Sequence, residues 1–271
     1  MTRARRARAA AAFGDFDFLH RRAMDDIVDR LETVKRDFPV AGFSGAGSLI
    51  DQLTPQCAVG SVINMDAAAA RLPASGLRCV ADEEASPLAP ASLDLYVSLL
   101  TLHTANDLVG ALAQTRTALK PDGLFIAAIF AEQTLESARQ ALYRAEAEIC
   151  SGVSPRFAPM ATIQDLGNAL SRAGFALPVA DVDAVRVEYG DLIALFRDLR
   201  GMGESASLVE GGRALRRDVI ALAAQYFGQD QRDLRFDLVY LTAWAPDKSQ
   251  PKPKAPGSAT ASLEEAIKKS G

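Results

Sequence analysis

The chain is poor in the residues that build metal centres and disulfide frameworks. Its 271 residues include only two histidines and three cysteines. Cys57, Cys79 and Cys150 are odd in number and far apart, so they indicate neither a disulfide framework nor a zinc site, and they fit a reducing compartment. Because His20 and His103 are the only histidines, a histidine-rich metal site is excluded.

Long hydrophobic runs and an excess of positive charge are also lacking. No apolar run reaches the roughly 20 residues that a transmembrane helix needs, and no secretory signal is visible. The net charge of −4 does not indicate a nucleic-acid surface, so we expect no nucleic-acid partner. Hydrophobic residues make up 49% of the chain, which is ample for one core in a domain of this size.

The stretch from Ser92 to Phe130 carries the clearest structural signal. The apolar run at residues 93–102 leaves no polar face, which is typical of a strand buried on both sides. Hydrophobic residues at helical spacing follow at 108–119, and a Pro-Asp-Gly turn at 121–123 precedes a second apolar run at 124–130. This order of strand, helix and strand predicts a parallel βαβ unit with a right-handed crossover.

The same stretch carries a family resemblance. Its segments LHTAND, at residues 102–107, and ALKPDGLF, at residues 118–125, resemble the S-adenosylmethionine-dependent methyltransferase fold. The closer similarity is to the branch that holds malonyl-acyl-carrier-protein methyltransferase and the mitochondrial complex I assembly factor 5. The later motifs DLGNALSRAGF and VDAVRVEYGDLIALFRDLRGMGES resemble the assembly-factor side of that branch.

The resemblance implies a fold and a division of the chain. The implied fold is α/β: a Rossmann-like seven-stranded methyltransferase sheet, mostly parallel with an antiparallel last strand, and with helices on both faces. We expect a basic N-terminal arm at residues 1–15, a methyltransferase-like domain at 16–245 and a flexible Pro/Lys-rich tail at 246–271.

The N-terminal arm has two interpretations. Its first 12 residues, MTRARRARAAAA, are basic and contain no acidic side chain. They predict either a helical arm of a cytoplasmic, bacterial-type protein or a transit peptide that directs the chain to the mitochondrial matrix. An amphipathic helix is expected next, from Phe18 to Val34, and places His20 at the surface or at a cap.

The glycine turn expected to bind the cofactor is degraded. The resemblance implies S-adenosylmethionine as cofactor, a strand that ends in an acid, and then a Gly-x-Gly-x-Gly turn. Glycine is needed in this turn because a Cβ would collide with the methionine part of the cofactor. Gly45 and Gly47 match the first two glycines, but Leu49 stands at the third position. The residues before the turn, Gly-Phe-Ser at 42–44, include no acid.

Acidic side chains do follow the next two expected strands. Asp66 ends the run from Val59, about 20 residues after the turn, where an acid accepts hydrogen bonds from both ribose hydroxyls of a nucleoside. As an alternative, Asp66 caps the following helix. Asp82 and Glu83 follow the strand at 77–81, where the resemblance implies an acid that accepts from the adenine amino group. A solvated acidic loop is the alternative there.

Polar residues also gather at the end of the strand at 93–102. Ligands of open α/β sheets bind at the carboxyl ends of strands where the strand order reverses, so Ser98 is a candidate cofactor contact. His103 is the candidate catalytic base, with a satisfied structural histidine as the alternative. Relatives often have tryptophan where Thr104 stands. The segment GMGES, at residues 201–205, either lines the mouth of this site or only ends a helix.

These observations leave functions from three classes. The first is an S-adenosylmethionine-dependent methyltransferase that acts on a protein or acyl-carrier-bound acceptor, with a subunit of the respiratory NADH dehydrogenase as one candidate partner. The second, implied by the assembly-factor resemblance, is a protein arginine hydroxylase in complex I assembly, although no two-histidine, one-carboxylate triad is visible. The third is an assembly or binding module that has lost cofactor binding, as the degraded turn suggests.

Overall fold

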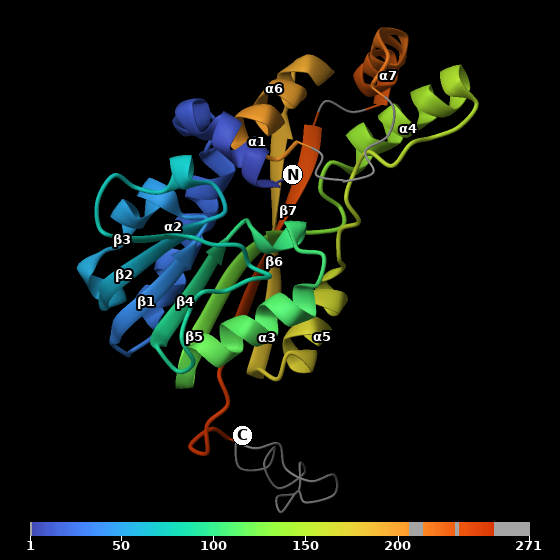
Figure 1. Cartoon of the computed structure of the whole chain (residues 1–271). Coiled ribbons are helices and arrows are strands. Elements are labelled where there is room, and N and C mark those ends of the chain that lie inside the picture. Colours follow the sequence, from blue (N-terminus) through green and yellow to red (C-terminus); the bar gives the residue numbers. More distant parts are fainter. Residues whose placement is uncertain (1, 206–213, 231–232, 252–271) are drawn as a thin grey trace, which may run out of the picture.

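A seven-stranded sheet organises the protein, for which a computed structural model describes residues 2–205, 214–230 and 233–251. The strand order is β3-β2-β1-β4-β5-β7-β6 (Figure 1). The strands are β1 (Phe38–Ser44), β2 (Val59–Asp66), β3 (Leu77–Val80), β4 (Leu93–Leu99), β5 (Leu119–Phe130), β6 (Ala176–Glu188) and β7 (Asp233–Trp244).

The pairing of the strands confirms the predicted fold class. Strands β1 to β5 pair in parallel, whereas β7 is antiparallel to both β5 and β6. The chain builds β1, β2 and β3 outward in one direction and then returns to place β4 on the other side of β1. The strand order therefore reverses between β1 and β4, and a ligand crevice is expected at their carboxyl ends.

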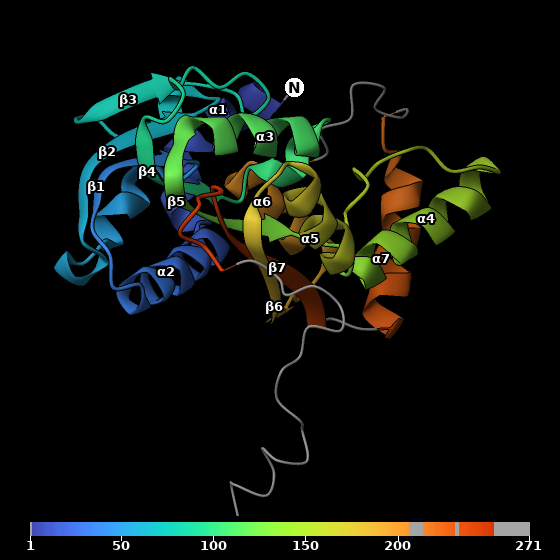
Figure 2. The same ribbon diagram turned by 90° about the horizontal axis from the view of Figure 1, so that it is seen from below.

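Helices cover both faces of the sheet (Figure 2). The helices are α1 (Thr2–Ala9), α2 (Phe18–Thr33), α3 (Leu108–Ala118), α4 (Glu136–Cys150), α5 (Ile163–Arg172), α6 (Leu192–Met202) and α7 (Arg217–Asp230). Helices α3 and α5 share one hydrophobic core with the sheet, and α2 belongs to the core on the opposite face together with α4, α6 and α7. None of the helices in the described ranges is long and apolar enough to cross a membrane.

Local signals in the sequence fix several element boundaries. Helix α5 begins with a complete capping box, in which the Thr162 hydroxyl accepts from the Asp165 N–H and the Asp165 carboxylate accepts from the Thr162 N–H. Gly174 follows this helix at φ +83°, as a residue after a helix end commonly does.

Two expected boundaries differ from the structure. The Pro-Asp-Gly segment at 121–123 does not separate a helix from a strand, because β5 already begins at Leu119 and carries the segment as an irregularity. There Asp122 has φ +61°, and the pairing with β4 shifts between Leu93 and Leu95. Helix α6 also continues through Met202, so the expected loop begins only at Gly203.

Candidate functional site

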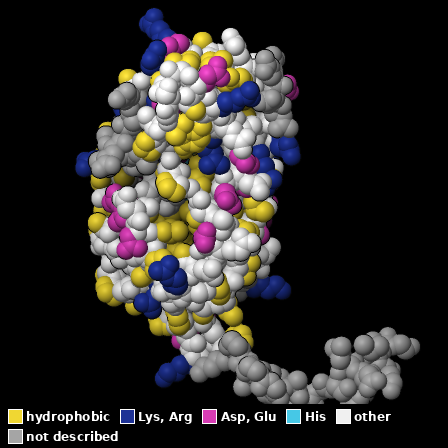
Figure 3. Space-filling view, turned by 90° about the vertical axis from the view of Figure 1, so that its right-hand side faces the viewer, with side chains coloured by type: hydrophobic (Ala, Val, Ile, Leu, Met, Phe, Trp, Pro, Cys, Tyr) yellow, Lys and Arg dark blue, Asp and Glu magenta, His cyan; other side chains and the backbone are white. Residues whose placement is uncertain are grey.

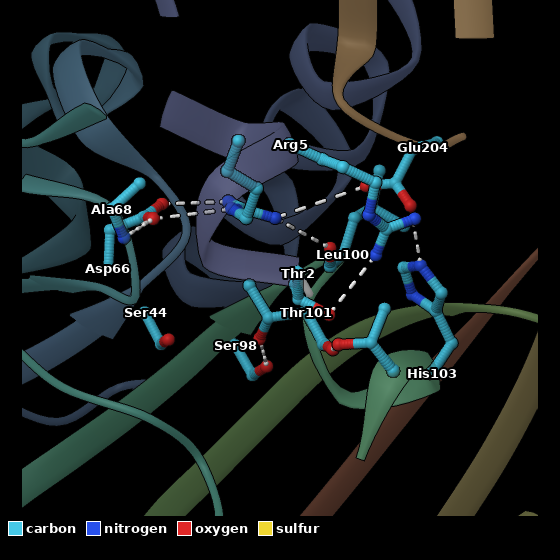
Figure 4. A network of polar contacts seen from close by, with 12 residues as sticks. Thr2, Arg5, Ser44, Asp66, Ala68, Ser98, Leu100, Thr101, His103 and Glu204 are labelled. Atoms are coloured by element: carbon cyan, nitrogen blue, oxygen red, sulfur yellow. Dashed lines mark hydrogen bonds and ion pairs between the residues drawn. The ribbon is translucent and has the colours of Figure 1, made fainter. Parts of the chain in front are cut away.

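Polar side chains converge at the carboxyl ends of β1, β2 and β4, beneath the N-terminal helix α1 (Figure 4). Ser44 ends β1, Asp66 ends β2, and Ser98 lies near the end of β4. All three side chains are buried. Their strands are neighbours at the point where the strand order reverses, so the fold itself brings these residues together.

Asp66 is bound by an arginine that sequence reasoning did not connect with it. Nε of Arg6 donates to Oδ1 of Asp66 at 3.2 Å, and Nη2 donates to Oδ2 at 2.8 Å. Nη1 of Arg6 donates to the carbonyl of Leu100 at 3.5 Å, while the N–H of Ala68 donates to Oδ1 of Asp66 at 2.8 Å. Only 3% of Arg6 and 1% of Asp66 are exposed, so this is a fully enclosed, two-pronged ion pair.

The environment of Arg6 keeps its guanidinium charged. Burial acts to lower the pKa of Arg6, but the charge of Asp66 and the hydrogen bonds to it outweigh burial and raise the pKa. Glu204 and Glu83 act in the same direction as Asp66. The guanidinium of Arg6 therefore lies close to several carboxylates.

The glycine turn after β1 packs tightly against the protein's own atoms. Gly45 has φ +78°, and a Cβ there would lie 2.4 Å from Cγ2 of Thr101 and 3.3 Å from Nη2 of Arg6. Gly47 has φ +54°, and its Cβ would lie 2.8 Å from the Arg71 carbonyl oxygen. Leu49, at the third glycine position, is buried in the core that contains α2. Both glycines are thus required by local packing.

A carboxylate from the loop after β3 contacts the end of β1. The hydroxyl of Ser44 donates to Oε1 of Glu83 at 2.7 Å. Asp82, next to it, is exposed and accepts a hydrogen bond from the N–H of Glu84 at 3.0 Å. Of the two acids after β3, Glu83 is therefore the one whose carboxylate contacts the end of β1.

Ser98 and Thr101 form a closed polar contact at the end of β4. Their hydroxyl oxygens lie 2.8 Å apart, and both side chains are buried. Ser98 itself is fully enclosed, so in this arrangement its hydroxyl serves the contact with Thr101.

His103 pairs with a second residue that sequence reasoning missed. It lies in the short 3₁₀ helix Leu102–Thr104, and its Nε2 is 2.8 Å from Oε2 of Glu204. Glu204 comes directly after Gly203, which ends α6 at φ +85°. The only sequence signal for Glu204 is its place in the GMGES segment. That segment alone does not show whether it lines the mouth of a site or only ends a helix.

The charge on Glu204 is strongly stabilised. Burial acts to raise the pKa of Glu204. The charge of His103, its hydrogen bond to Glu204 and the charge of Arg6 outweigh burial and lower the pKa to about 2. Nη1 of Arg6 is 3.9 Å from Oε1 of Glu204. Glu204 therefore links Arg6 in the crevice to His103.

A largely apolar cavity of about 510 Å³ lies next to this pair. Its charged or titratable lining residues are Arg5, His103, Arg156, Arg200 and Glu204. Its apolar lining includes Phe130, Leu142, Phe157, Met160, Phe196 and Phe236. On the face of the molecule shown in Figure 3, hydrophobic side chains gather in the middle with charged side chains around them. A cavity of this size and composition suits an extended apolar ligand.

His20 is fully buried, so the expectation of a surface or capping position is wrong. Its ring packs edge-on against Phe13 with the centroids 4.8 Å apart, and neither ring nitrogen has a partner in the described residues. Burial, assisted by the charge of Arg71, lowers the pKa of His20 well below its usual value. His20 thus belongs to the packing beneath the N-terminal arm.

The described residues contain no group of three or more His, Cys, Asp or Glu side chains placed to hold a metal ion. What the arrangement offers is a cluster of carboxylates at the strand ends and a histidine–glutamate pair beside an apolar cavity. These groups can accept hydrogen bonds from hydroxyl, amino or guanidinium donors, and the histidine can exchange a proton.

Comparisons with known proteins agree with this architecture. A family model described as "Methyltransferase domain" matches residues 43–127. The chain is 36% identical over 266 residues to mouse "Arginine-hydroxylase NDUFAF5, mitochondrial", covering 93% of this chain and 78% of that protein. It is 33% identical over 266 residues to the "Malonyl-[acyl-carrier protein] O-methyltransferase" of Laribacter hongkongensis, covering 88% of this chain and 86% of that protein.

Solved structures show the same fold at low sequence identity. The YcgJ protein of Bacillus subtilis matches with a TM-score of 0.55 and 11% identity, covering 83% of this chain and 99% of that one. A methyltransferase-like protein of Bacillus halodurans matches with a TM-score of 0.53 and 12% identity, covering 82% and 98%.

Proposed function

The chain belongs to the methyltransferase-fold family that includes arginine-hydroxylase NDUFAF5 and malonyl-[acyl-carrier protein] O-methyltransferase, and within it we propose an S-adenosylmethionine-dependent transferase. Its acceptor in this proposal is a protein or a carrier-bound group, as the names of both kinds of relative suggest. The methyltransferase-like domain is assigned to residues 16–245, and the chain is placed in the bacterial cytoplasm or, like relatives named mitochondrial, in the mitochondrion.

One observation carries the proposal: Asp66 offers both carboxylate oxygens to a pair of adjacent donors. In the structure these donors are Nε and Nη2 of Arg6. The two hydroxyls of a ribose are also a pair of adjacent hydrogen-bond donors that a carboxylate can accept. The chemistry of the site therefore fits the nucleoside part of S-adenosylmethionine. In this proposal, Arg6 occupies the place of the ribose in the conformation described.

The remaining cofactor contacts are assigned from the same group of strand ends. Glu83 and Asp82 would hold the adenine end, with Ser98 nearby, and the backbone at Gly45 and Gly47 would approach the methionine end. When bound, this cofactor supplies a methyl group on an activated sulfonium.

The acceptor is assigned to the apolar cavity beside His103. Glu204 holds Nε2 of His103, while Nδ1 has no partner among the described residues. His103 is therefore suited to orient an acceptor and to take up a proton at Nδ1.

Arginine hydroxylation is the second candidate, because the crevice already holds a guanidinium. The guanidinium of Arg6 contacts Asp66 directly and lies 3.9 Å from Glu204. The carboxylates at this site therefore bind the same kind of side chain that the name arginine-hydroxylase gives as the target of the NDUFAF5 relatives. Under the third candidate, an assembly module, the same carboxylates serve only to hold α1 in place.

Calorimetric titration with S-adenosylmethionine tests cofactor use. We expect saturable binding by the full chain and by Arg6→Ala, which frees Asp66, and at least about tenfold weaker binding when Asp66→Ala is added. Asp29→Ala is the matched control, because Asp29 is exposed. If neither the wild type nor Arg6→Ala binds at millimolar ligand, the proposal fails and the assembly module remains.

Mass spectrometry separates the two enzymatic candidates. Respiratory-complex subunits and carrier proteins from a deletion strain are compared with those from the parent strain. A lost methyl group supports the transferase, whereas a lost oxygen atom on an arginine supports the hydroxylase and contradicts the transferase.

A further inference from the structure

The N-terminal helix α1 lies across the carboxyl ends of the strands (Figure 1), and its Arg6 side chain enters the crevice. It packs between α6 and the short 3₁₀ helix Ala69–Arg71. Arg6 is the inserted side chain, and it reaches Asp66, which lies 60 positions later in the sequence. An N-terminal segment thus fills a site built from the central strands.

Arg6 and a nucleoside cannot share Asp66. Both carboxylate oxygens of Asp66 already accept hydrogen bonds from Arg6, and only 1% of the residue is exposed. Nη2 of Arg6 also lies 3.3 Å from the position of a Cβ on Gly45, so the guanidinium fills the space over the glycine turn. The cofactor contacts assigned to Asp66 and Gly45 therefore require that Arg6 leave first.

We propose that α1 is an intramolecular plug: Arg6 closes the crevice at Asp66, and S-adenosylmethionine binds only when α1 swings out. This inference rests on the proposed function, because it takes the crevice to be the cofactor site. The apparent affinity for S-adenosylmethionine is the intrinsic affinity of the open form multiplied by the fraction of molecules in which α1 is out. The stability of the closed form therefore sets the cofactor concentration that the protein requires.

The way α1 is held fits a segment that can be released. Its buried residues are Arg5, Arg6 and Ala9, so it contributes almost no apolar side-chain surface to the core. Nε of Arg5 is buried and has no hydrogen-bond partner among the described residues, and the positive charge of Arg71 lies close enough to interact with Arg6. The helix is therefore retained mainly by the polar contacts of Arg6 with Asp66, Glu204 and the Leu100 carbonyl, and not by hydrophobic packing.

Removing the plug's side chain is the first test. Arg6→Ala should bind S-adenosylmethionine at least about tenfold more tightly than the wild type in calorimetry, since the closed state loses its main contact. Arg3→Ala is the matched control, because it removes the same charge from an exposed position of the same helix. Equal affinities of Arg6→Ala and Arg3→Ala would overturn the proposal.

A reversible lock is the second test and does not depend on losing a buried charge. A Cβ on Gly203 would lie 3.5 Å from Cβ of Ala9, which is within the range for a disulfide. In an Ala9→Cys, Gly203→Cys, Cys150→Ser chain, the oxidised form should not bind the cofactor and the reduced form should. Strain at Gly203 is common to both forms and cancels. Equal binding by both forms would overturn the plug.

Hydrogen exchange distinguishes failure of the plug from failure of the proposed function. Amides of residues 2–9 should exchange faster when S-adenosylmethionine is added to the wild-type chain, because α1 leaves the crevice. If the cofactor binds and these amides stay equally protected, the plug is wrong and the proposed function stands. If no variant binds the cofactor, both are wrong.

Discussion

His103 and Glu204, 101 positions apart in the sequence, meet with 2.8 Å between Nε2 and Oε2. The end of β4 places the histidine, and the turn after α6 places the glutamate. Because both side chains are only 11% exposed, the pair is shielded from solvent and contributes to stability as well as to the candidate site. The pH dependence of that contribution follows from the lowered pKa of Glu204.

We expect Glu204→Gln to lower the free energy of unfolding more at pH 6 than at pH 3. The folded protein holds the pKa of Glu204 at about 2, below its usual 4.5, so the stabilisation is complete above pH 4.5 and is lost as the pH falls toward 2. The full effect is at most about 3 kcal/mol. Denaturant titration measures it, with the exposed Glu132→Gln as control. A loss of equal size at both pH values would contradict the assignment.

The buried His20 predicts a second pH effect. Its pKa in the folded protein lies well below the unfolded value of 6.5, so the unfolded chain binds the proton first and stability falls as the pH drops below 6.5. The slope from this group is at most about 1.4 kcal/mol per pH unit. His20→Phe should flatten the dependence of stability on pH between 5 and 6.5. An unchanged slope in that variant would show that His20 does not titrate as stated.

Two glycines in helices should respond in opposite ways to alanine. A Cβ on Gly201 in α6 would lie 2.2 Å from the Phe16 ring, so Gly201→Ala should destabilise the fold by about 1–3 kcal/mol. Gly167 in α5 has open space, so Gly167→Ala should stabilise by about 0.5–1 kcal/mol through helix propensity. Thermal melts of both variants measure this. A stabilising Gly201→Ala would mean that Phe16 does not pack on α6 as described, and a destabilising Gly167→Ala would contradict the open space at that position.

The capping box at the start of α5 gives a local prediction. Thr162→Ala removes the acceptor for the Asp165 N–H and should lower the free energy of unfolding by about 1 kcal/mol. Thr117→Ala makes the same chemical change at an exposed position inside α3 and should be neutral or slightly stabilising, because alanine favours helix. Equal losses in the two variants would show that the cap contributes nothing beyond the loss of a threonine.

Much of the architecture is readable from local sequence. The βαβ unit at 92–130, the capping box of α5 and the glycine after it are encoded within a few residues of where they occur, and each is found in the structure. The start of β5 is not readable in this way. The same Pro-Asp-Gly chemistry serves a turn between elements and a bulge inside a strand, and only the pairing with β4 decides between them.

The candidate site is less readable, because its pairings span long stretches of chain. The strand order brings Ser44, Asp66 and Ser98 to one crevice, as open α/β sheets generally do. Nothing local to Asp66 indicates Arg6 as its partner, and nothing local to His103 indicates Glu204. Likewise, the helical period around His20 did not reveal that Phe13 covers it.

The sequence by itself determined the order of strands and helices, the family, and which acids follow which strands. These features depend on side-chain periodicity and turn chemistry within short segments. Only the tertiary structure decided that Arg6 fills the crevice at Asp66 and that Glu204 joins His103 to it. A buried charge is stable only next to a group of opposite charge. Which residue supplies that group depends on how the chain packs in three dimensions and not on neighbours in the sequence.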